Sequence, residues 1–148
     1  NFDIFDKENR DYFITLINKA IKLAHNKFIS DKKAIAELGE GWVAEEALAI
    51  ALYSTIKYSN NFEKAIICSI NHNGDSDSTG AIAGNIIGTY LGYNKIPSYY
   101  IENLELKDII LEIAEDLYKG CPISEYSNDK DEYWQSKYLY LKRDLSKK

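Results

Sequence analysis

One short segment, NHNGDSDSTG at residues 71–80, concentrates side chains that could bind a cation. Two carboxylates alternate there with hydroxyl groups, in the order Asp75, Ser76, Asp77, Ser78 and Thr79. Carboxylates this close repel each other unless one is protonated or a cation bridges them. A hard divalent cation such as Mg²⁺ prefers carboxylate, hydroxyl and water oxygens. The residue types and their spacing therefore indicate a metal site.

Helix capping is the alternative explanation for the same residues. An apolar helix is predicted over residues 80–91, so that Ser78 or Thr79 could cap it while the carboxylates interact with the positive end of its dipole. A calcium-binding EF-hand loop is excluded, because its twelfth position, counted from Asp75, is Ile86 instead of the required glutamate. The residues alone leave the metal site and the cap open.

The rest of the chain shows helical periodicity and no convincing β alternation or repeat, so we expect an all-α fold. The pattern predicts helices over 11–28, from the cap Ser30 to 38, from Val43 through 56, over 62–70 with Asn61 or Asn60 as the cap, over 80–91, over 104–120, and around Tyr133, Trp134, Tyr138 and Leu139. A Gly-x-Gly turn at residues 39–41 precedes the third of these helices, and Glu45 and Glu46 are predicted to lie on its surface, where they suit the helix dipole. A polar loop over 71–78 presents the aspartates.

Four glycines recur every four residues and form one stripe of the predicted helix: Gly80, Gly84, Gly88 and Gly92. Each glycine in a helix interior costs roughly 1 kcal/mol relative to alanine. The stripe therefore predicts a close approach by a neighbouring helix and, near Gly80, by a ligand.

The composition narrows the class of protein. The 148 residues carry a net charge of −5, which argues against nucleic acid or an anionic membrane as a partner. No apolar run approaches the roughly 18–20 residues of a membrane span. Cys68 and Cys121 are isolated, which favours free thiols in a cytoplasmic protein. Because the chain starts at Asn1 and contains no methionine, we expect it to be a piece of a longer protein.

The segment NHNGDSDSTGAIAGNIIGTYLG resembles the C-terminal signature of the ADP-ribosylglycohydrolase family, of the dinitrogenase-reductase-activating glycohydrolase type. The upstream GEGWVAEEALAIALY and the downstream IPSYYIENLELKDIILEIAEDLY are similar to the same family in the same order, so the similarity covers about residues 39–118. The resemblance implies a compact orthogonal helical bundle, of which residues 1–148 form the incomplete C-terminal part. The Asn-, Lys- and Ile-rich composition favours a bacterial source.

The resemblance also implies a site with two Mg²⁺ ions, or Mn²⁺, in the full-length protein. Asp75 and Asp77 match the two C-terminal metal-binding aspartates, and Ser78 matches a hydroxyl ligand that is often threonine. The metals would hold the ribose hydroxyls and orient the glycosidic bond. Its hydrolysis releases ADP-ribose from a modified protein or small molecule.

Further substrate-binding residues are expected beside the aspartates: Trp42, His72, Asn73, Gly74, Ser76 and Gly80. His72 could orient a ligand or a metal-bound water, or it could be a structural loop residue. Trp42 could stack on the ligand, or it could pack in the core as the first bulky residue of its helix.

The family's other metal ligands come from an N-terminal motif of a hydroxyl residue and two aspartates, and this motif is absent here. The nearest match is SDK at Ser30, which lacks the second aspartate. We therefore expect no catalytic residue in this chain, weak Mg²⁺ binding and no activity in isolation. The glycine stripe should face the missing helices, and exposed apolar surface should favour self-association. The alternatives are an ADP-ribose-binding module without catalysis, or a structural helical domain with capping aspartates.

Overall fold

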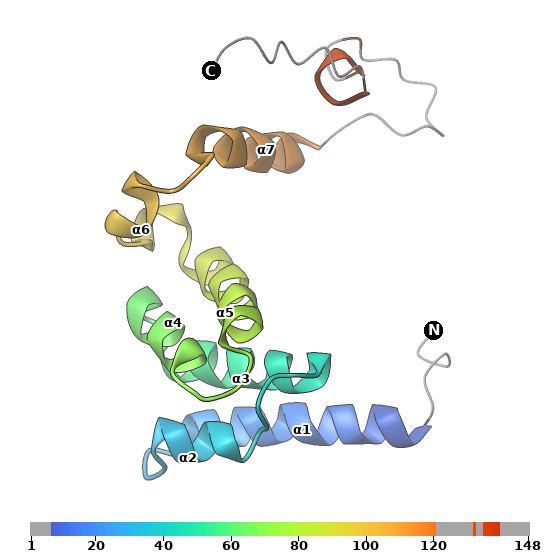
Figure 1. Cartoon of the computed structure of the whole chain (residues 1–148), viewed down its shortest axis with the longest axis vertical. Coiled ribbons are helices and arrows are strands. Elements are labelled where there is room, and N and C mark those ends of the chain that lie inside the picture. Colours follow the sequence, from blue (N-terminus) through green and yellow to red (C-terminus); the bar gives the residue numbers. More distant parts are fainter. Residues whose placement is uncertain (1–6, 121–131, 133–134, 140–148) are drawn as a thin grey trace. The chain divides into compact units, whose positions relative to one another are not determined.

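The computed structural model describes residues 7–120, 132 and 135–139 (Figure 1). These residues divide into two units, one ending at Glu102 and one starting at Asn103, and each is described by itself. The first unit contains α1 (Lys7–His25), α2 (Asp31–Ala36), α3 (Ala44–Lys57), α4 (Phe62–Ile70), α5 (Ser76–Leu91), η1 (Tyr93–Lys95) and α6 (Tyr99–Glu102). The second contains α7 (Lys107–Lys119) and the π-helical turn η2 (Gln135–Leu139). The described residues include no strand, which confirms the all-α prediction.

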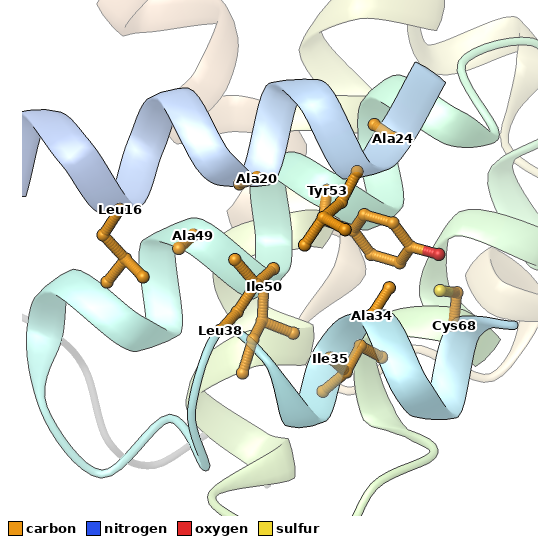
Figure 2. Close-up of a cluster of buried hydrophobic side chains, with 11 residues drawn as sticks. Leu16, Ala20, Ala24, Ala34, Ile35, Leu38, Ala49, Ile50, Tyr53 and Cys68 are labelled. Carbon is orange, nitrogen blue, oxygen red and sulfur yellow. The ribbon is translucent and has the colours of Figure 1, made fainter. Parts of the chain in front are cut away.

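The core of the first unit lies between α1, α2, α3 and α4 (Figure 2). Helix α1 contributes Leu16, Ala20, Leu23 and Ala24, whose spacing of three and four residues places them on one face. Helix α3 is buried on more than one side, because α1 packs against it on one side and α4 and α5 pack against it elsewhere. Small alanines at these contacts let the helices approach closely. This packing holds the N-terminal ends of α3 and α5 in the same unit.

Helix ends are fixed by side chains in two of the predicted places. The Ser30 hydroxyl accepts a hydrogen bond from the Lys33 N–H at 3.4 Å and caps α2. The Asn61 side chain accepts from the Lys64 N–H at 2.9 Å and caps α4. Both caps follow from local sequence.

The glycine stripe of α5 faces α4 and the segment after α5. An added Cβ would lie 2.6 Å from Ile70 Cγ2 at Gly80, 3.8 Å from Ile66 Cδ1 at Gly84, and 3.9 Å from Ile96 Cδ1 at Gly88. The prediction that the stripe faces helices missing from the chain is therefore wrong. Only the contact at Gly80 is closer than ordinary van der Waals packing among these three.

A polar cluster joins the start of α2 to the end of α3, and we call it the Asp31 cluster. The Asp31 carboxylate accepts hydrogen bonds from Tyr53 Oη, Tyr58 Oη and Lys57 Nζ, each at 2.7 Å. Burial alone would raise the pKa of Asp31, but these hydrogen bonds outweigh it and hold the pKa below its ordinary value. Burial first, and then the hydrogen bond to Asp31, raise the pKa of Tyr58 to about 12.

Cys68 lies beside this cluster in α4, is 5% exposed, and accepts a hydrogen bond from the Ser54 hydroxyl at 3.4 Å. Burial raises the pKa of its thiol to about 11. In a Cys121→Ser variant, we expect iodoacetamide at pH 8 to modify Cys68 on the order of 100-fold more slowly than free cysteine, because so little thiolate forms. Labelling followed by mass spectrometry measures the rate. Equal rates before and after unfolding in urea would contradict the prediction.

In the second unit, Asp116 of α7 binds Lys137 and Tyr138 of η2. Hydrogen bonds from these two residues lower the pKa of Asp116. Of the predicted last helix, Tyr133 and Trp134 lie outside the described residues, as does Cys121. None of the helices in the described part of the chain is long and apolar enough to cross a membrane.

Candidate functional site

Two loops of the first unit meet at their backbones beside the aspartates. One is the Gly-x-Gly turn, residues 39–41 between α2 and α3, and the other is the aspartate loop, residues 71–75 between α4 and α5. The Asp75 N–H donates a hydrogen bond to the Glu40 carbonyl at 2.8 Å. A Cβ at Gly74 would overlap that carbonyl oxygen and lie 2.6 Å from its carbon. The contact therefore requires glycine at position 74.

Glu46 holds the Gly-x-Gly turn from the first turn of α3. Its Oε2 accepts hydrogen bonds from the N–H groups of Glu40 and Gly41, both at 3.1 Å. Gly39 and Gly41 have φ values of 122° and 82°, in the left-handed region that favours glycine. Glu46 is half-buried, like Glu45, and so lies partly on the helix surface, but the sequence did not predict that its carboxylate binds this turn. A carboxylate shortly after a Gly-x-Gly turn was the available signal.

His72 fixes the conformation of the aspartate loop. Its Nδ1 accepts from the Gly74 N–H at 3.1 Å, so the proton lies on Nε2, which is 3.0 Å from the Thr79 hydroxyl. Thr79 is fully buried and its hydroxyl donates to the Ser69 carbonyl at 2.7 Å. Because both ring nitrogens have partners within the protein, the geometry supports the structural alternative for His72.

Asp75 caps α5, and α5 begins earlier than the sequence predicted. The Asp75 Oδ1 accepts from the Ser78 N–H at 3.2 Å, and the helix runs from Ser76. The prediction of Ser78 or Thr79 as the cap is therefore wrong, and the polar loop ends at Asp75 instead of Ser78. Asp77 lies exposed in the first helical turn. The N-terminal end of α5 thus carries both aspartates.

Both carboxylates lie at this helix end, Asp75 at the cap and Asp77 in the first turn. Hydrogen bonding with the Asp77 side chain is the first cause that lowers the pKa of Asp75, followed by the side chain and the N–H of Ser78. A carboxylate has about four lone-pair sites, so Asp75 can cap the helix and still bind a cation. Within the described ranges, no three His, Cys, Asp or Glu side chains come together as a metal-binding group. The donor set fits part of an Mg²⁺ or Mn²⁺ shell, made of two carboxylates and the Ser78 hydroxyl.

Comparisons with known proteins identify the family of the chain. The sequence profile of the ADP-ribosylglycohydrolase family matches residues 5–125. The chain belongs to this family. The match to the family profile is thus longer than the segment 39–118 that the sequence motifs cover.

Three relatives of the chain carry related names. Mouse ADP-ribosylhydrolase ARH3 is 28% identical over 66% of this chain and 29% of its own length. Serratia proteamaculans ADP-ribosylarginine hydrolase Tri1 is 31% identical, over 65% of this chain and 26% of its own. Rhodospirillum rubrum ADP-ribosyl-[dinitrogen reductase] glycohydrolase is 37% identical over 33% and 17%. The matched part thus spans less than a third of each relative. No solved structure matches the chain.

The other residues expected from the ADP-ribosylglycohydrolase pattern are also placed. Trp42 is 67% exposed and its Nε1 donates to Glu40 Oε2 at 3.1 Å, so it does not pack in the core. Asn73 is exposed and Ser76 is half-buried. At Gly80, Ile70 of α4 occupies the space of a side chain, so packing explains this glycine. The substrate contacts of these residues stay predictions.

A cleft of about 650 Å³ borders the aspartate loop on its N-terminal side. Its lining includes Asn71, His72 and Asn73, together with Lys32 of α2 and Lys64 of α4. Asp75 and Asp77 do not belong to the lining. The cleft therefore extends along the aspartate loop as far as Gly74, directly before Asp75.

Proposed function

We propose that this chain contributes one half of a divalent-metal site at which the complete protein hydrolyses ADP-ribosylated substrates. The observation that carries the proposal is the placement of Asp75, Asp77 and Ser78 together at the cap and in the first turn of α5. Family membership supplies the reaction class, which is cleavage of the glycosidic bond and release of ADP-ribose. The metal we propose is Mg²⁺, with Mn²⁺ as a substitute.

Each residue of the half-site has a role that its chemistry allows. Asp75 and Asp77 provide negatively charged oxygens and Ser78 provides a neutral hydroxyl. A bound pair of divalent cations supplies positive charge that can hold a ribose diol and polarise water. The carboxylates also place negative charge near the sugar, which favours an oxocarbenium-like transition state. Since no catalytic acid is proposed in this chain, the isolated chain is expected to be inactive.

A substitution of Asp77 tests metal binding without removing the helix cap, because Asp75 is the residue that caps α5. We expect Mg²⁺ plus ADP-ribose to raise the melting temperature of the chain, since a ligand that binds only the native state stabilises it. Asp77→Asn should leave the melting temperature without ligand within about 2 °C of wild type, as for a surface substitution of less than 0.5 kcal/mol, and abolish the rise. Asp75→Asn should do the same, because asparagine caps helices nearly as well as aspartate. Differential scanning fluorimetry measures the shift.

The matched control is Asp108→Asn, which removes an exposed carboxylate from the first turn of α7. It should keep the full rise with ligand. A rise that persists in Asp77→Asn would contradict the proposed metal site and would leave capping as the role of Asp75.

An ADP-ribose-binding module without catalysis is the second candidate. It is favoured by the small donor set at α5. Among the described residues, this set consists of two carboxylates and a hydroxyl, and no further acidic side chain joins it as a metal-binding group. Calorimetric titration of the complete protein with ADP-ribose and Mg²⁺, run beside an assay for ADP-ribose released from a modified substrate, distinguishes the two. Binding by the complete protein without release would favour the module.

A further inference from the structure

We propose that Glu46 is a positioning residue of the metal site, acting on Asp75 through the Gly-x-Gly turn. This inference rests on the proposed function, since it concerns the same pair of aspartates. Glu46 itself binds neither metal nor substrate in this proposal. Its carboxylate fixes the turn, and the turn fixes the backbone of Asp75.

The first step is the contact between Glu46 and the turn. One carboxylate oxygen accepts two successive N–H groups, those of Glu40 and Gly41, at 3.1 Å each. Both oxygens would lie 2.6 Å from a Cβ at Gly39, so the carboxylate occupies the space that a side chain would need there. A turn with two glycines loses more conformational entropy on ordering than other turns. An acceptor that binds two of its N–H groups offsets that cost.

The second step is the contact between the turn and Asp75. The Glu40 carbonyl accepts from the Asp75 N–H at 2.8 Å. On the other side of the same residue, a Cβ at Gly41 would lie 3.4 Å from the Asp75 carbonyl oxygen and 2.9 Å from Thr79 Cγ2. The turn therefore bonds the amide of Asp75 and lies close to its carbonyl. Movement of the turn should shift the backbone that carries the Asp75 carboxylate.

The third step separates Glu46 from its neighbour. Glu45 and Glu46 both lie in the first turn of α3 and both are half-buried, so they interact with the helix dipole alike. The N–H groups of the Gly-x-Gly turn, however, donate to Glu46. Glu45→Ala is therefore a matched control for loss of charge and of helix dipole stabilisation.

The test compares Glu46→Ala, Glu46→Gln and Glu45→Ala in the whole chain by two measurements. Hydrogen exchange of the Asp75 amide, followed by NMR without metal, reports the contact between turn and loop. Mn²⁺ affinity, followed by water-proton relaxation, reports the metal pair. In Glu46→Ala we expect exchange about tenfold faster and Mn²⁺ affinity about tenfold weaker, the equivalent of one lost hydrogen bond. Glu45→Ala should match wild type in both.

Glu46→Gln keeps an acceptor oxygen and should restore most of both signals. If circular dichroism shows that Glu46→Ala does not fold, Gly39→Ala is used instead, because its Cβ would displace the Glu46 carboxylate. Gly39→Ala should then show the same faster exchange and weaker Mn²⁺ affinity, while Glu46→Gln stays close to wild type. Unchanged exchange or unchanged Mn²⁺ affinity in folded Glu46→Ala would overturn the positioning role. If wild type binds no Mn²⁺, the proposed metal site itself fails. The two failures are thus distinct.

Discussion

Replacing Gly74 with alanine is expected to destabilise the protein by roughly 2–4 kcal/mol, the sum of an overpacked contact and a lost hydrogen bond. The added Cβ would overlap the Glu40 carbonyl oxygen and lie 2.8 Å from Glu40 Cα. These are backbone atoms, so no side-chain rotation relieves the overlap. The Asp75 N–H would lose its acceptor, and the aspartate pair would lose its support. Urea denaturation measures the stability, and Mn²⁺ titration measures the site.

Gly84→Ala is the matched control for this substitution. Gly84 lies inside α5, and its Cβ would lie 3.8 Å from Ile66 Cδ1 of α4, an ordinary van der Waals contact. Because alanine favours a helix interior by about 1 kcal/mol over glycine, we expect equal or higher stability and unchanged Mn²⁺ binding. Wild-type stability in Gly74→Ala, with slow exchange of the Asp75 amide, would show that the two loops do not need this close contact.

Helix positions were predictable where the signal was local. Ser30 and Asn61 cap α2 and α4 as expected, because a capping side chain binds an N–H three residues ahead in its own sequence. The start of α5 was placed too late, since several consecutive residues of the segment 75–79 are all good caps. Asp75 is the cap among these residues, and its N–H donates to the Glu40 carbonyl, 35 positions earlier in the chain. The local sequence around Asp75 does not indicate that contact.

The glycines show the same limit. A stripe at Gly80, Gly84 and Gly88 looked like the main packing feature, yet Gly84 and Gly88 make only ordinary contacts. Gly74, which the sequence marked only as a neighbour of the aspartates, makes the closest backbone contact. Periodicity identifies which residues share a helix face, whereas the demand for glycine depends on what lies opposite. The hydrogen bonds of Glu46 to the Gly-x-Gly turn were not predictable for the same reason.

In the sequence, Asp31 belongs to the SDK segment, the nearest match to the missing metal-binding motif, but in the structure it binds side chains of α3 and of the residue after it. It accepts hydrogen bonds from Lys57 of α3 and from the two tyrosines Tyr53 and Tyr58. These partners lie 22–27 residues away along the chain. Their convergence on one carboxylate depends on how α2 packs on α3, which no sequence pattern specified.

Replacing Asp31 with alanine is expected to cost roughly 2–3 kcal/mol at pH 7, below the usual loss for a fully buried pair because the site is partly open to solvent. The Asp31 and Lys57 side chains are 34% and 18% exposed. Removing the carboxylate leaves the Lys57 ammonium with the Tyr53 hydroxyl and the Ile29 carbonyl as partners and without its counter-charge. Tyr58→Phe removes one hydrogen bond and should cost about 1 kcal/mol. Chemical denaturation of both variants measures the losses.

The pH dependence of this cost follows from the lowered pKa of Asp31. A carboxylate whose pKa is lower in the folded than in the unfolded state stabilises the protein fully above its unfolded value of about 3.9. The stabilisation disappears as pH falls through the lower folded value. The difference between wild type and Asp31→Ala should therefore be constant from pH 7 to 5 and shrink below about pH 4. A difference that stays constant down to pH 2 would show that the hydrogen bonds, and not the charge, account for it.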